Sequence, residues 1–478
     1  MFSSRIFIFV KNSSDYFMKK NFFSIIIVSC FLAHPSLAQS EFAADSVFIK
    51  KIFDKSLSEG KAYEWLRVLT TEIGGRLSGS HGAAKAVAYT QSVMEKEAFD
   101  RVFLQPVNVP HWVRGKAENA YIETKGKQVK VPIAALGGSV ATPAKGVKAP
   151  VIEVQSFLEL RALGKEKVQG KIVFFNRPMD PTQLSTFDAY RGAVDQRGNG
   201  ATEAAKLGAV GAIVRSMTTR LDDFPHTGGM RYGVGVPLIP TAAISTNGAE
   251  LLSKSLKENP ETKFFFEQHC ETLPDAPSHN VIGELKGTTQ SAQIVVAGGH
   301  LDSWDLAQGA HDDGSGCVQA IEALRLLKGL GYTPKRTLRA VMFMNEENGL
   351  RGGVAYADSA RTKKEIHLAA IESDRGGFTP LGFGVVGDAA KKARIVSWQP
   401  LFAPYGLHAI GPGGGGADIG PLAQQGTTLL GLIPDSQRYF DYHHAASDTF
   451  DAVSKRELQM GAAAMAAMLY LIDKYGLD

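Results

Sequence analysis

Histidines and acidic side chains directly follow three apolar runs in the second half of the chain. His300 and Asp302 come after QIVVAGG, Glu346 and Glu347 come after VMFM, and Asp374 comes after AAIE. In open α/β sheets, sites form beyond the carboxyl ends of the strands, so these side chains are expected to meet at one edge of a sheet. Carboxylates gathered in this way repel one another unless cations lie between them. The pattern therefore predicts a metal site.

Each of these residues also has an ordinary structural explanation when it is taken alone. A lone His300 is more often a structural histidine than a ligand. Asp312 and Asp313, in GAHDDGSG, are typical of a helix N-cap with an acidic first turn. The two glutamates could form a solvated loop, and His443 and His444 could form an exposed turn. The metal site is predicted from the combination and not from any single member.

The cysteine content limits the choice of metal ligands. Beyond residue 38 the chain holds only Cys270 and Cys317, which are too few for a thiolate zinc site. Any metal must therefore bind to His, Asp and Glu. Whether the two thiols pair is left open, because nothing in the nearby sequence requires a disulfide.

Five short motifs, taken together, resemble those of the co-catalytic di-zinc aminopeptidases. They are HLD (300–302), AHDDGSG (310–316), NEENG (345–349), ESD (372–374) and HHAASDT (443–449). Their order and short spacings agree with that family. The loop TEIGGRLSGSHG (71–82) also resembles the N-terminal loop of the family. The resemblance covers most of the chain after residue 38 and implies a site for two zinc ions.

The resemblance assigns the metal ligands in two sets that share one member. The sets are Asp312 as the bridge, His300 and Asp374 for one zinc ion, and Glu347 and His444 for the other. Nitrogen and oxygen donors of this kind suit zinc when a position is left open for water. His444 is preferred to His443 because its four-residue spacing to Asp448 matches the tail of the family.

The resemblance also implies roles for three residues that do not bind metal. Glu346 is expected to take a proton from the attacking water and to pass it to the leaving amine. Asp302 is expected to hold the ring of His300. Many relatives have a tyrosine just before the last ligand, which donates a hydrogen bond to the oxyanion. Here that position is His443, with Tyr442 one residue earlier, so His443 is the candidate donor.

The glycine-rich segment GPGGGGADIG (411–420) lacks the lysine of a phosphate-binding loop, so nucleotide binding is not expected. Its glycines are expected to allow the backbone to approach the substrate closely. Asp418, within the segment, is predicted either to help define the substrate pocket or to form a turn.

Strand and helix patterns predict an α/β fold with a mostly parallel central sheet flanked by helices. Apolar runs at 293–299, 338–344, 368–372 and 429–433 alternate with helical stretches, and a long apolar helix is expected over 455–476. Residues 113–273 resemble the protease-associated domain, a smaller module inserted into secreted peptidases; a plain α/β insertion is the alternative. The catalytic domain would then comprise 39–112 and 274–478.

The N-terminus resembles a secretory signal. Lys19 and Lys20 precede an apolar run (21–33), and cleavage is expected after Ala38, with Met18 as a second candidate start. The run is short for a membrane span. Secretion or periplasmic export is expected, and a lipid anchor at Cys30 is the alternative. Without residues 1–38 the net charge is 48 − 47 = +1, which does not suggest binding to nucleic acid or to an anionic membrane.

The sequence therefore predicts a secreted di-zinc exopeptidase that acts on short peptides near a free amino terminus, as an aminopeptidase or dipeptidase. The alternatives are a carboxypeptidase acting on short peptides, a single-zinc transferase, and a non-catalytic interaction protein of the same fold. The transferase and the interaction protein are disfavoured because all five ligands and Glu346 are present. Dimers are common in the family, so a homodimer is a further expectation.

Overall fold

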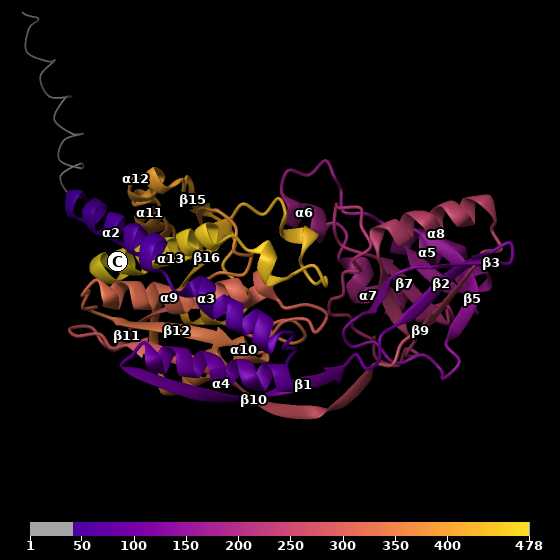
Figure 1. Cartoon of the computed structure of the whole chain (residues 1–478), viewed down its shortest axis with the longest axis horizontal. Coiled ribbons are helices and arrows are strands. Elements are labelled where there is room, and N and C mark those ends of the chain that lie inside the picture. The colour runs from indigo at the N-terminus through magenta and orange to yellow at the C-terminus, as the bar shows by residue number, and fades with distance from the viewer. Residues whose placement is uncertain (1–41, 478) are drawn as a thin grey trace, which may run out of the picture. The chain divides into compact units, whose positions relative to one another are not determined.

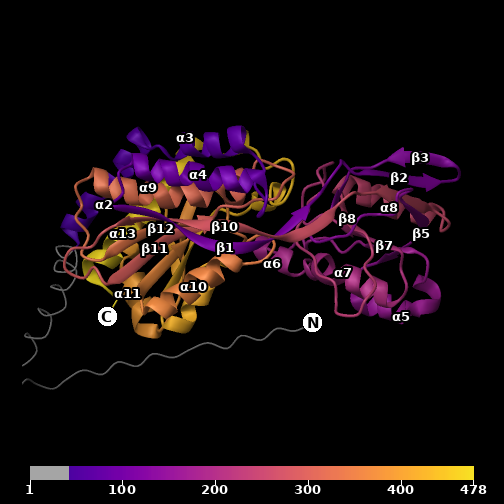
Figure 2. The same ribbon diagram turned by 90° about the horizontal axis from the view of Figure 1, so that it is seen from below.

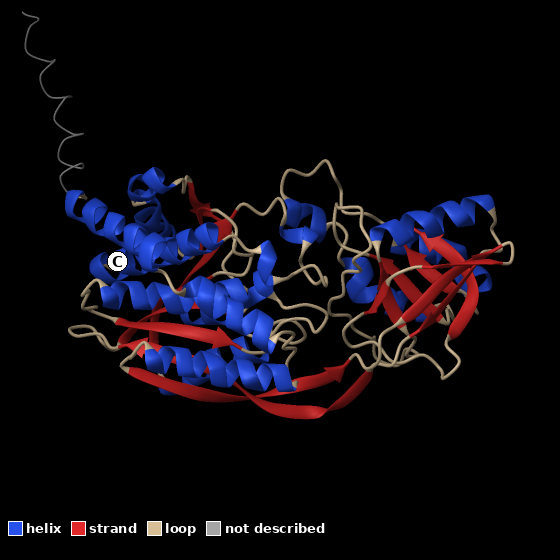
Figure 3. Cartoon of the chain, viewed as in Figure 1, coloured by secondary structure: helices blue, strands red, loops and turns tan. Residues whose placement is uncertain are grey.

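The computed structural model describes residues 42–477, and those from Phe48 onward belong to one compact unit. The predicted signal segment and Cys30 lie outside the described residues. Two eight-stranded sheets, each flanked by helices, make up the fold (Figures 1 and 3). Within the described part of the chain, no helix combines the length and apolar content that a membrane span requires.

The first sheet has the strand order β1-β10-β12-β11-β13-β16-β14-β15. Its four central strands, which run parallel to one another, are β12 (Thr337–Phe343), β11 (Gln293–His300), β13 (Ile366–Glu372) and β16 (Thr428–Pro434). These are the four apolar runs of the sequence, and burial on both faces explains their continuous apolar character. Antiparallel partners extend the sheet on both sides, so its centre is parallel and its edges are mixed.

The edge strands of this sheet have weaker sequence signals than the central ones. They are β1 (Arg101–Val113), β10 (Glu271–Leu285), β14 (Pro380–Val386) and β15 (Ala409–Pro412). The β10 strand alternates between exposed and half-buried residues over its first half and becomes continuously buried over its second half. Such a change of pattern within one strand is hard to recognise from the sequence.

Helices cover both faces of the first sheet. Figure 2 shows α4 (His81–Lys96) and α9 (Ser315–Gly329) on one face and α10 (Arg351–Lys363) on the other. The long helix α13 (Lys455–Tyr475) packs against α9 and is buried along most of its length, which explains its alanine and methionine content. The helix α2 (Ala43–Glu59) and the shorter helices α3 (Ala62–Arg67), α11 (Ala389–Ser397) and α12 (Gln399–Phe402) complete this region.

All strands of the second sheet fall between Asn119 and Glu267. In spatial order they are β3 (Lys127–Lys130), β2 (Asn119–Thr124), β9 (Lys263–Glu267), β5 (Val147–Val154), β6 (Ile172–Phe175), β7 (Gly211–Arg215), β8 (Thr241–Ile244) and β4 (Ile133–Ala135). The helices of this region are α5 (Phe157–Val168), α6 (Thr186–Arg191), α7 (Asp195–Lys206) and α8 (Thr246–Glu258). Separate apolar clusters pack around this sheet. The region thus has an α/β core of its own; its assignment as a protease-associated domain stays a prediction.

The two cysteines of the described chain are free and buried. The Cys317 thiol lies 3.1 Å from the backbone carbonyl of His300, and Cys270 lies beside the Gln268 amide. Each thiol thus has its own neighbours, and the structure contains no bond between them.

Candidate metal and active site

The strand register brings the predicted residues to one edge of the first sheet. His300, the last residue of β11, pairs with Phe343 at the end of β12, and Gly298 pairs with Glu372 at the end of β13. Because these strands are parallel, the segments that follow them leave the sheet on the same side. Glu346, Glu347 and Asp374 lie in those segments, as the sequence predicted.

The first candidate metal group consists of His300, Asp312 and Asp374. One ligand atom from each lies within 4.8 Å of the others. The Nε2 atom of His300 is 3.2 Å from Asp312 Oδ1 and 3.4 Å from Asp374 Oδ1. The other ring nitrogen of His300, Nδ1, lies 3.0 Å from the backbone carbonyl of Asp302. If Nδ1–H donates to that carbonyl, the lone pair of Nε2 is free to bind a cation.

The second candidate group consists of Asp312, His443 and His444, and the Glu347 carboxylate lies beside His444. The Nε2 atom of His444 is 3.0 Å from Glu347 Oε2 and 3.3 Å from Asp312 Oδ2, and its Nδ1 lies 3.3 Å from the carbonyl of Thr227. This arrangement repeats that of His300, with one ring nitrogen on a carbonyl and the other facing carboxylates. His443 also lies near Asp312, but its Nε2 is 3.9 Å from Oδ2 and its Nδ1 has no hydrogen-bond partner. The geometry therefore favours His444 as the ligand.

Buried charges at this edge call for a cation. Asp312 Oδ2 and Glu347 Oε1 are buried without a hydrogen-bond partner among the described residues. Burial, followed by the charge of Asp312, raises the pKa of Glu347 to about 7. Burial would lower the pKa of His444, but Glu347 and Asp312 outweigh it and raise that pKa to about 10. The negative charge that helps to raise these pKa values is the charge that a bound metal cation would neutralise. The oxygen and nitrogen donors fit zinc.

Glu346 lies beside the candidate ligands and faces a cavity. Burial raises its pKa well above the usual glutamate value; the charge of His300 lowers it, and the Asp374 and Glu347 carboxylates raise it further. The cavity has a volume of about 530 Å³ and is lined by Asp312, Glu346, Glu347, Asp374 and His444, among others. A carboxylate in this position can exchange protons with a molecule held in the cavity.

Asp302 holds the loop that carries the two glutamates. Its Oδ1 atom accepts hydrogen bonds from the backbone N–H groups of Asn345 and Glu346, at 2.7 and 3.0 Å. Asp302 Oδ1 is 4.0 Å from His300 Nδ1, whereas the backbone carbonyl oxygen of Asp302 is only 3.0 Å from that ring nitrogen. The residue thus orients His300 through its backbone, whereas we had expected its side chain to do so. Its carboxylate instead positions Glu346.

Two supporting residues were not singled out from the sequence. Asp448 accepts hydrogen bonds from the backbone N–H groups of His311 and Asp312, at 2.8 and 3.1 Å. Arg76, fully buried in the TEIGGRLSGSHG loop, donates to the carbonyls of Leu301, Gln308 and Gly309. Both residues shape the chain on either side of the bridging aspartate. The motif resemblance included their segments but did not indicate these contacts.

The region between β1 and β10 contributes directly to this cavity. Phe187, Tyr190 and Arg197 line it from that region, opposite the residues that follow the strands of the first sheet. Tyr190 stacks on Phe440, with ring centroids 4.8 Å apart, and meets the His443 ring edge-on at 5.2 Å. The inserted region therefore forms one wall of the site.

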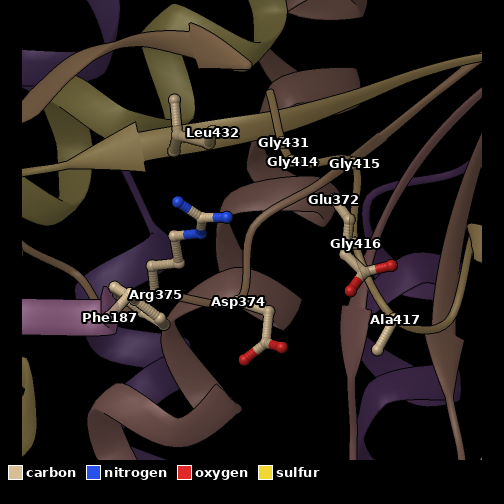
Figure 4. A pocket seen from close by; sticks show the side chains of 10 residues that line it. All are labelled: Phe187, Glu372, Asp374, Arg375, Gly414, Gly415, Gly416, Ala417, Gly431 and Leu432. Carbon is tan, nitrogen blue, oxygen red and sulfur yellow. The ribbon is translucent and has the colours of Figure 1, made fainter. Parts of the chain in front are cut away.

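A second cavity, of about 310 Å³, adjoins the first and shares Phe187 and Asp374 with it. Figure 4 shows Arg375 on one side of it, Glu372 on the other and the Asp374 carboxylate between them. The glycines at 414–416 run along its wall. A Cβ atom at Gly414 would lie 2.4 Å from Arg375 Nη2, and one at Gly416 would lie 2.0 Å from Glu372 Cδ. These glycines thus make room for two charged side chains of the protein itself.

Asp418, which the sequence placed either at the substrate pocket or in a turn, lies apart from the two cavities. Its side chain is fully buried and lines neither of the two cavities. Burial and the nearby Glu372 carboxylate raise the pKa of Asp418 well above its usual range.

Tyr442 points away from the site, and Tyr439 takes a place that we had not expected. Tyr442 stacks on His311, with ring centroids 5.1 Å apart. Tyr439 lines the larger cavity together with His443, and their ring centroids are 5.2 Å apart. His443 therefore remains the donor candidate next to the ligand, with Tyr439 beside it.

Comparison with known proteins decides the family. A model of peptidase family M28 matches residues 280–469. Carboxypeptidase Q from Xenopus laevis is 36% identical over 439 residues, which cover 91% of this chain and 91% of that protein. The chain belongs to peptidase family M28. A solved structure of an M28 peptidase precursor from Shewanella amazonensis is 33% identical, with a TM-score of 0.86, and covers 90% of this chain and 96% of that one.

The M28 assignment confirms the predicted family resemblance, α/β fold class and enzyme class. The zinc aminopeptidase BSAP from Bacillus subtilis is 22% identical and has a TM-score of 0.62, with 86% of this chain and 94% of that one covered, which supports the fold. The chain is therefore a peptidase, with peptides as its substrates.

Proposed function

We propose that this M28 peptidase is a di-zinc exopeptidase that hydrolyses short peptides next to a free amino terminus. The observation that carries the proposal is the shared position of Asp312, which belongs to both candidate metal groups. One carboxylate between two imidazoles is the arrangement that a bridged pair of cations requires. In this proposal His300 and Asp374 hold one zinc ion, and Glu347 and His444 hold the other.

The chain's own residues supply the proton transfers. Zinc at this site would lower the pKa of a water molecule and polarise the peptide carbonyl. Glu346 faces the cavity and takes the proton of the attacking water, then gives it to the leaving amine. Asp302 fixes the backbone of Glu346, which keeps the carboxylate aimed at the cavity.

His443 is proposed to stabilise the oxyanion of the transition state. It lines the cavity, and its buried Nδ1 atom has no hydrogen-bond partner among the described residues. Burial and the charge of His444 hold the pKa of His443 well below its usual value, so the ring is neutral. A neutral imidazole still carries one N–H group that can donate a hydrogen bond.

The polarity of cleavage rests on the charge of the site. Four carboxylates, from Asp312, Glu346, Glu347 and Asp374, face the larger cavity. Two zinc ions would largely offset these four charges, and a zinc-bound free amine is then the form in which the site would hold the amino terminus. The wall formed by the inserted region would limit the length of the substrate. Carboxypeptidase action on short peptides is the second candidate, favoured by the carboxypeptidase Q relatives.

Two measurements test this proposal. Elemental analysis should find two zinc ions per chain, and activity on an unblocked dipeptide should be lost in a strong chelator and return as two equivalents of zinc are added. Full activity with a single zinc ion contradicts the two-metal arrangement. The second measurement compares a free dipeptide with its N-acetylated form. Faster hydrolysis of the acetylated form reverses the polarity and supports the carboxypeptidase candidate.

Secretion or periplasmic export, by the signal expected at 1–38, belongs to the same proposal. The proposal also divides the chain into catalytic parts at 39–112 and 274–478, with an insertion at 113–273. It further includes a homodimer. Export is checked by N-terminal sequencing of the protein from the producing cells, where cleavage after Ala38 is expected; a diacylglyceryl group on Cys30 contradicts it in favour of the lipid anchor. Light scattering tests the dimer.

A further inference from the structure

Arg197, on α7, is a buried cation without a carboxylate partner among the described residues. Its side chain is only 7% exposed. Its Nη2 group donates to the Tyr190 hydroxyl at 2.6 Å, but its Nη1 group has only two contacts at 3.5 Å, with Thr227 O and His444 Nδ1. Its Nε atom has no partner within the described chain. A buried charge is costly unless it is paired, so this guanidinium needs an anion.

Several other buried arginines of the described chain have carboxylate partners, and two more, Arg76 and Arg336, are held by backbone carbonyls and a side-chain amide instead. Arg114 forms ion pairs with Glu118 and Asp305. Arg339 forms ion pairs with Glu284 and Glu365. A buried arginine with a structural role thus has either carboxylates or several carbonyls around its guanidinium. Arg197 differs because its Nε atom has no partner among the described residues and its side chain lines the larger cavity, together with Glu346 and Asp312.

The backbone around Arg197 is shaped to hold the guanidinium in place. A Cβ atom at Gly228 would lie 2.5 Å from Arg197 Cζ and 2.6 Å from Nη1. The φ angle of Gly228 is +137°, which few other residues adopt. Glycine at this position leaves room for the charged group, and the Tyr190 hydroxyl fixes its orientation.

We propose that Arg197 binds a carboxylate of the peptide substrate, and that the free C-terminal carboxylate of a dipeptide fits best. Arg197 Nη1 lies 3.5 Å from the ring of the candidate zinc ligand His444. Arg197 and the proposed base Glu346 line the same cavity, so the carboxylate of a short substrate held there can meet the guanidinium. Arginine can hold a carboxylate with two parallel hydrogen bonds. This inference rests on the proposed function and narrows it to dipeptides.

Arg197 adds a positive charge to a site whose sequence motifs are acidic. No arginine lies within the five sequence motifs. The motifs alone therefore indicate recognition of the substrate's amino end but not of its carboxylate. The fold brings Arg197 into the site from another segment, over 100 residues before the first motif. A dipeptide would then be held at both ends, with its amine at the acidic side and its carboxylate at Arg197. A longer peptide would place an uncharged amide beside Arg197 and lose that interaction.

The test uses three substrates that differ in the position of the carboxylate. These are alanyl-alanine, alanyl-alaninamide, and the amide of alanyl-glutamate, in which only the side chain is acidic. The zinc-loaded full chain is expected to prefer the free dipeptide to its amide by about 10- to 100-fold in kcat/KM, the range for a charged hydrogen bond. Equal rates for these two substrates overturn the proposal. A glutamyl amide as good as the free dipeptide would assign the site to an acidic side chain and contradict the C-terminal form.

Variants then show whether Arg197 causes the preference. Arg197→Gln should reduce the preference to within about threefold while hydrolysis of the amide persists, and Arg197→Lys should keep part of it. The control is Arg231→Gln, which removes the same charge from an exposed arginine on the wall of the same cavity and should keep the preference. An equal loss on both substrates in Arg197→Gln means that the residue is structural, which contradicts the inference.

A binding measurement covers the case in which the variant does not fold or no dipeptide is cleaved. Calorimetry on the wild-type chain should show that alanine, a product that carries the carboxylate, binds at least about tenfold more tightly than alaninamide. Equal affinities overturn the role of Arg197, whether or not the chain cleaves dipeptides. Lack of dipeptide cleavage together with tighter binding of alanine leaves this inference standing and sinks the proposed function instead.

Discussion

The carboxylate of Asp448 accepts a hydrogen bond from the backbone N–H of Asp312, at 3.1 Å. Its other oxygen accepts from His311 N–H, at 2.8 Å, so one buried side chain fixes two consecutive peptide groups. Asp312 is the residue that both candidate metal groups share. By fixing the backbone of Asp312, Asp448 helps to fix the position of the carboxylate that both candidate metal groups share.

Asp448→Asn should weaken zinc binding without removing a ligand. The amide group keeps one acceptor oxygen, but its NH₂ group must face a backbone N–H. We expect zinc affinity to fall by about 10- to 100-fold, the usual effect of losing a group that supports the ligands. Competition with a chromophoric chelator measures this affinity. Asp451→Asn, at an exposed carboxylate nearby, is the matched control and should bind zinc as the wild type does. Unchanged affinity in Asp448→Asn would show that the backbone holds its shape unaided.

Glu346 and Glu347 are neighbours with different proposed tasks, and paired variants separate them. Glu346→Gln should keep its zinc and lower kcat by about 10²–10⁴-fold, because it loses the proton acceptor. Glu347→Gln should lose zinc instead, since Glu347 faces His444 at 3.0 Å. Zinc content by elemental analysis and turnover on a dipeptide are measured on both variants. Zinc loss in Glu346→Gln but not in Glu347→Gln would reverse the two roles.

The two adjacent histidines should also separate. His444→Ala should lose one zinc ion, because its Nε2 faces two carboxylates. His443→Ala should keep both ions and lower kcat by about 10²–10³-fold, the range for one oxyanion donor. Zinc content and turnover are again the measurements. Equal zinc loss in the two variants would mean that His443 is also a ligand.

The parts of the site that the sequence could predict are those set by strand ends. His300 and Asp374 follow continuous apolar runs, so periodicity alone places them at the same edge of a parallel sheet. The paired central strands follow from the same pattern. The antiparallel edges were missed because a strand such as β10 changes its burial along its length.

The residues that the sequence could not place act across long separations. Arg76 donates to carbonyls more than 200 positions away, and Arg197 reaches His444 from the inserted region. Neither carries a local signal, since a single arginine in a loop or helix usually lies in solvent. The glycine-rich loop around Asp418 was also difficult to interpret, because its glycines make room for Glu372 and Arg375 of the protein itself.

Gly416 provides a test of that last contact. A methyl group at this position would lie 2.0–2.3 Å from the carboxylate atoms of Glu372. Glu372 is buried and accepts a hydrogen bond from Ile419 N–H at 2.9 Å, so it cannot turn away without losing that bond. Gly416→Ala should therefore lower the free energy of unfolding by about 1–3 kcal/mol, the usual cost of overpacking.

Urea denaturation measures this change, with wild type and variant in the same zinc state. Gly420→Ala is the matched control, because a Cβ atom there has no neighbour within 4 Å. The control should be as stable as the wild type to within about 0.5 kcal/mol, as expected away from packed contacts. If Gly416→Ala is no less stable than Gly420→Ala, the glycine loop can move aside, and the close approach to Glu372 is not what requires glycine at position 416.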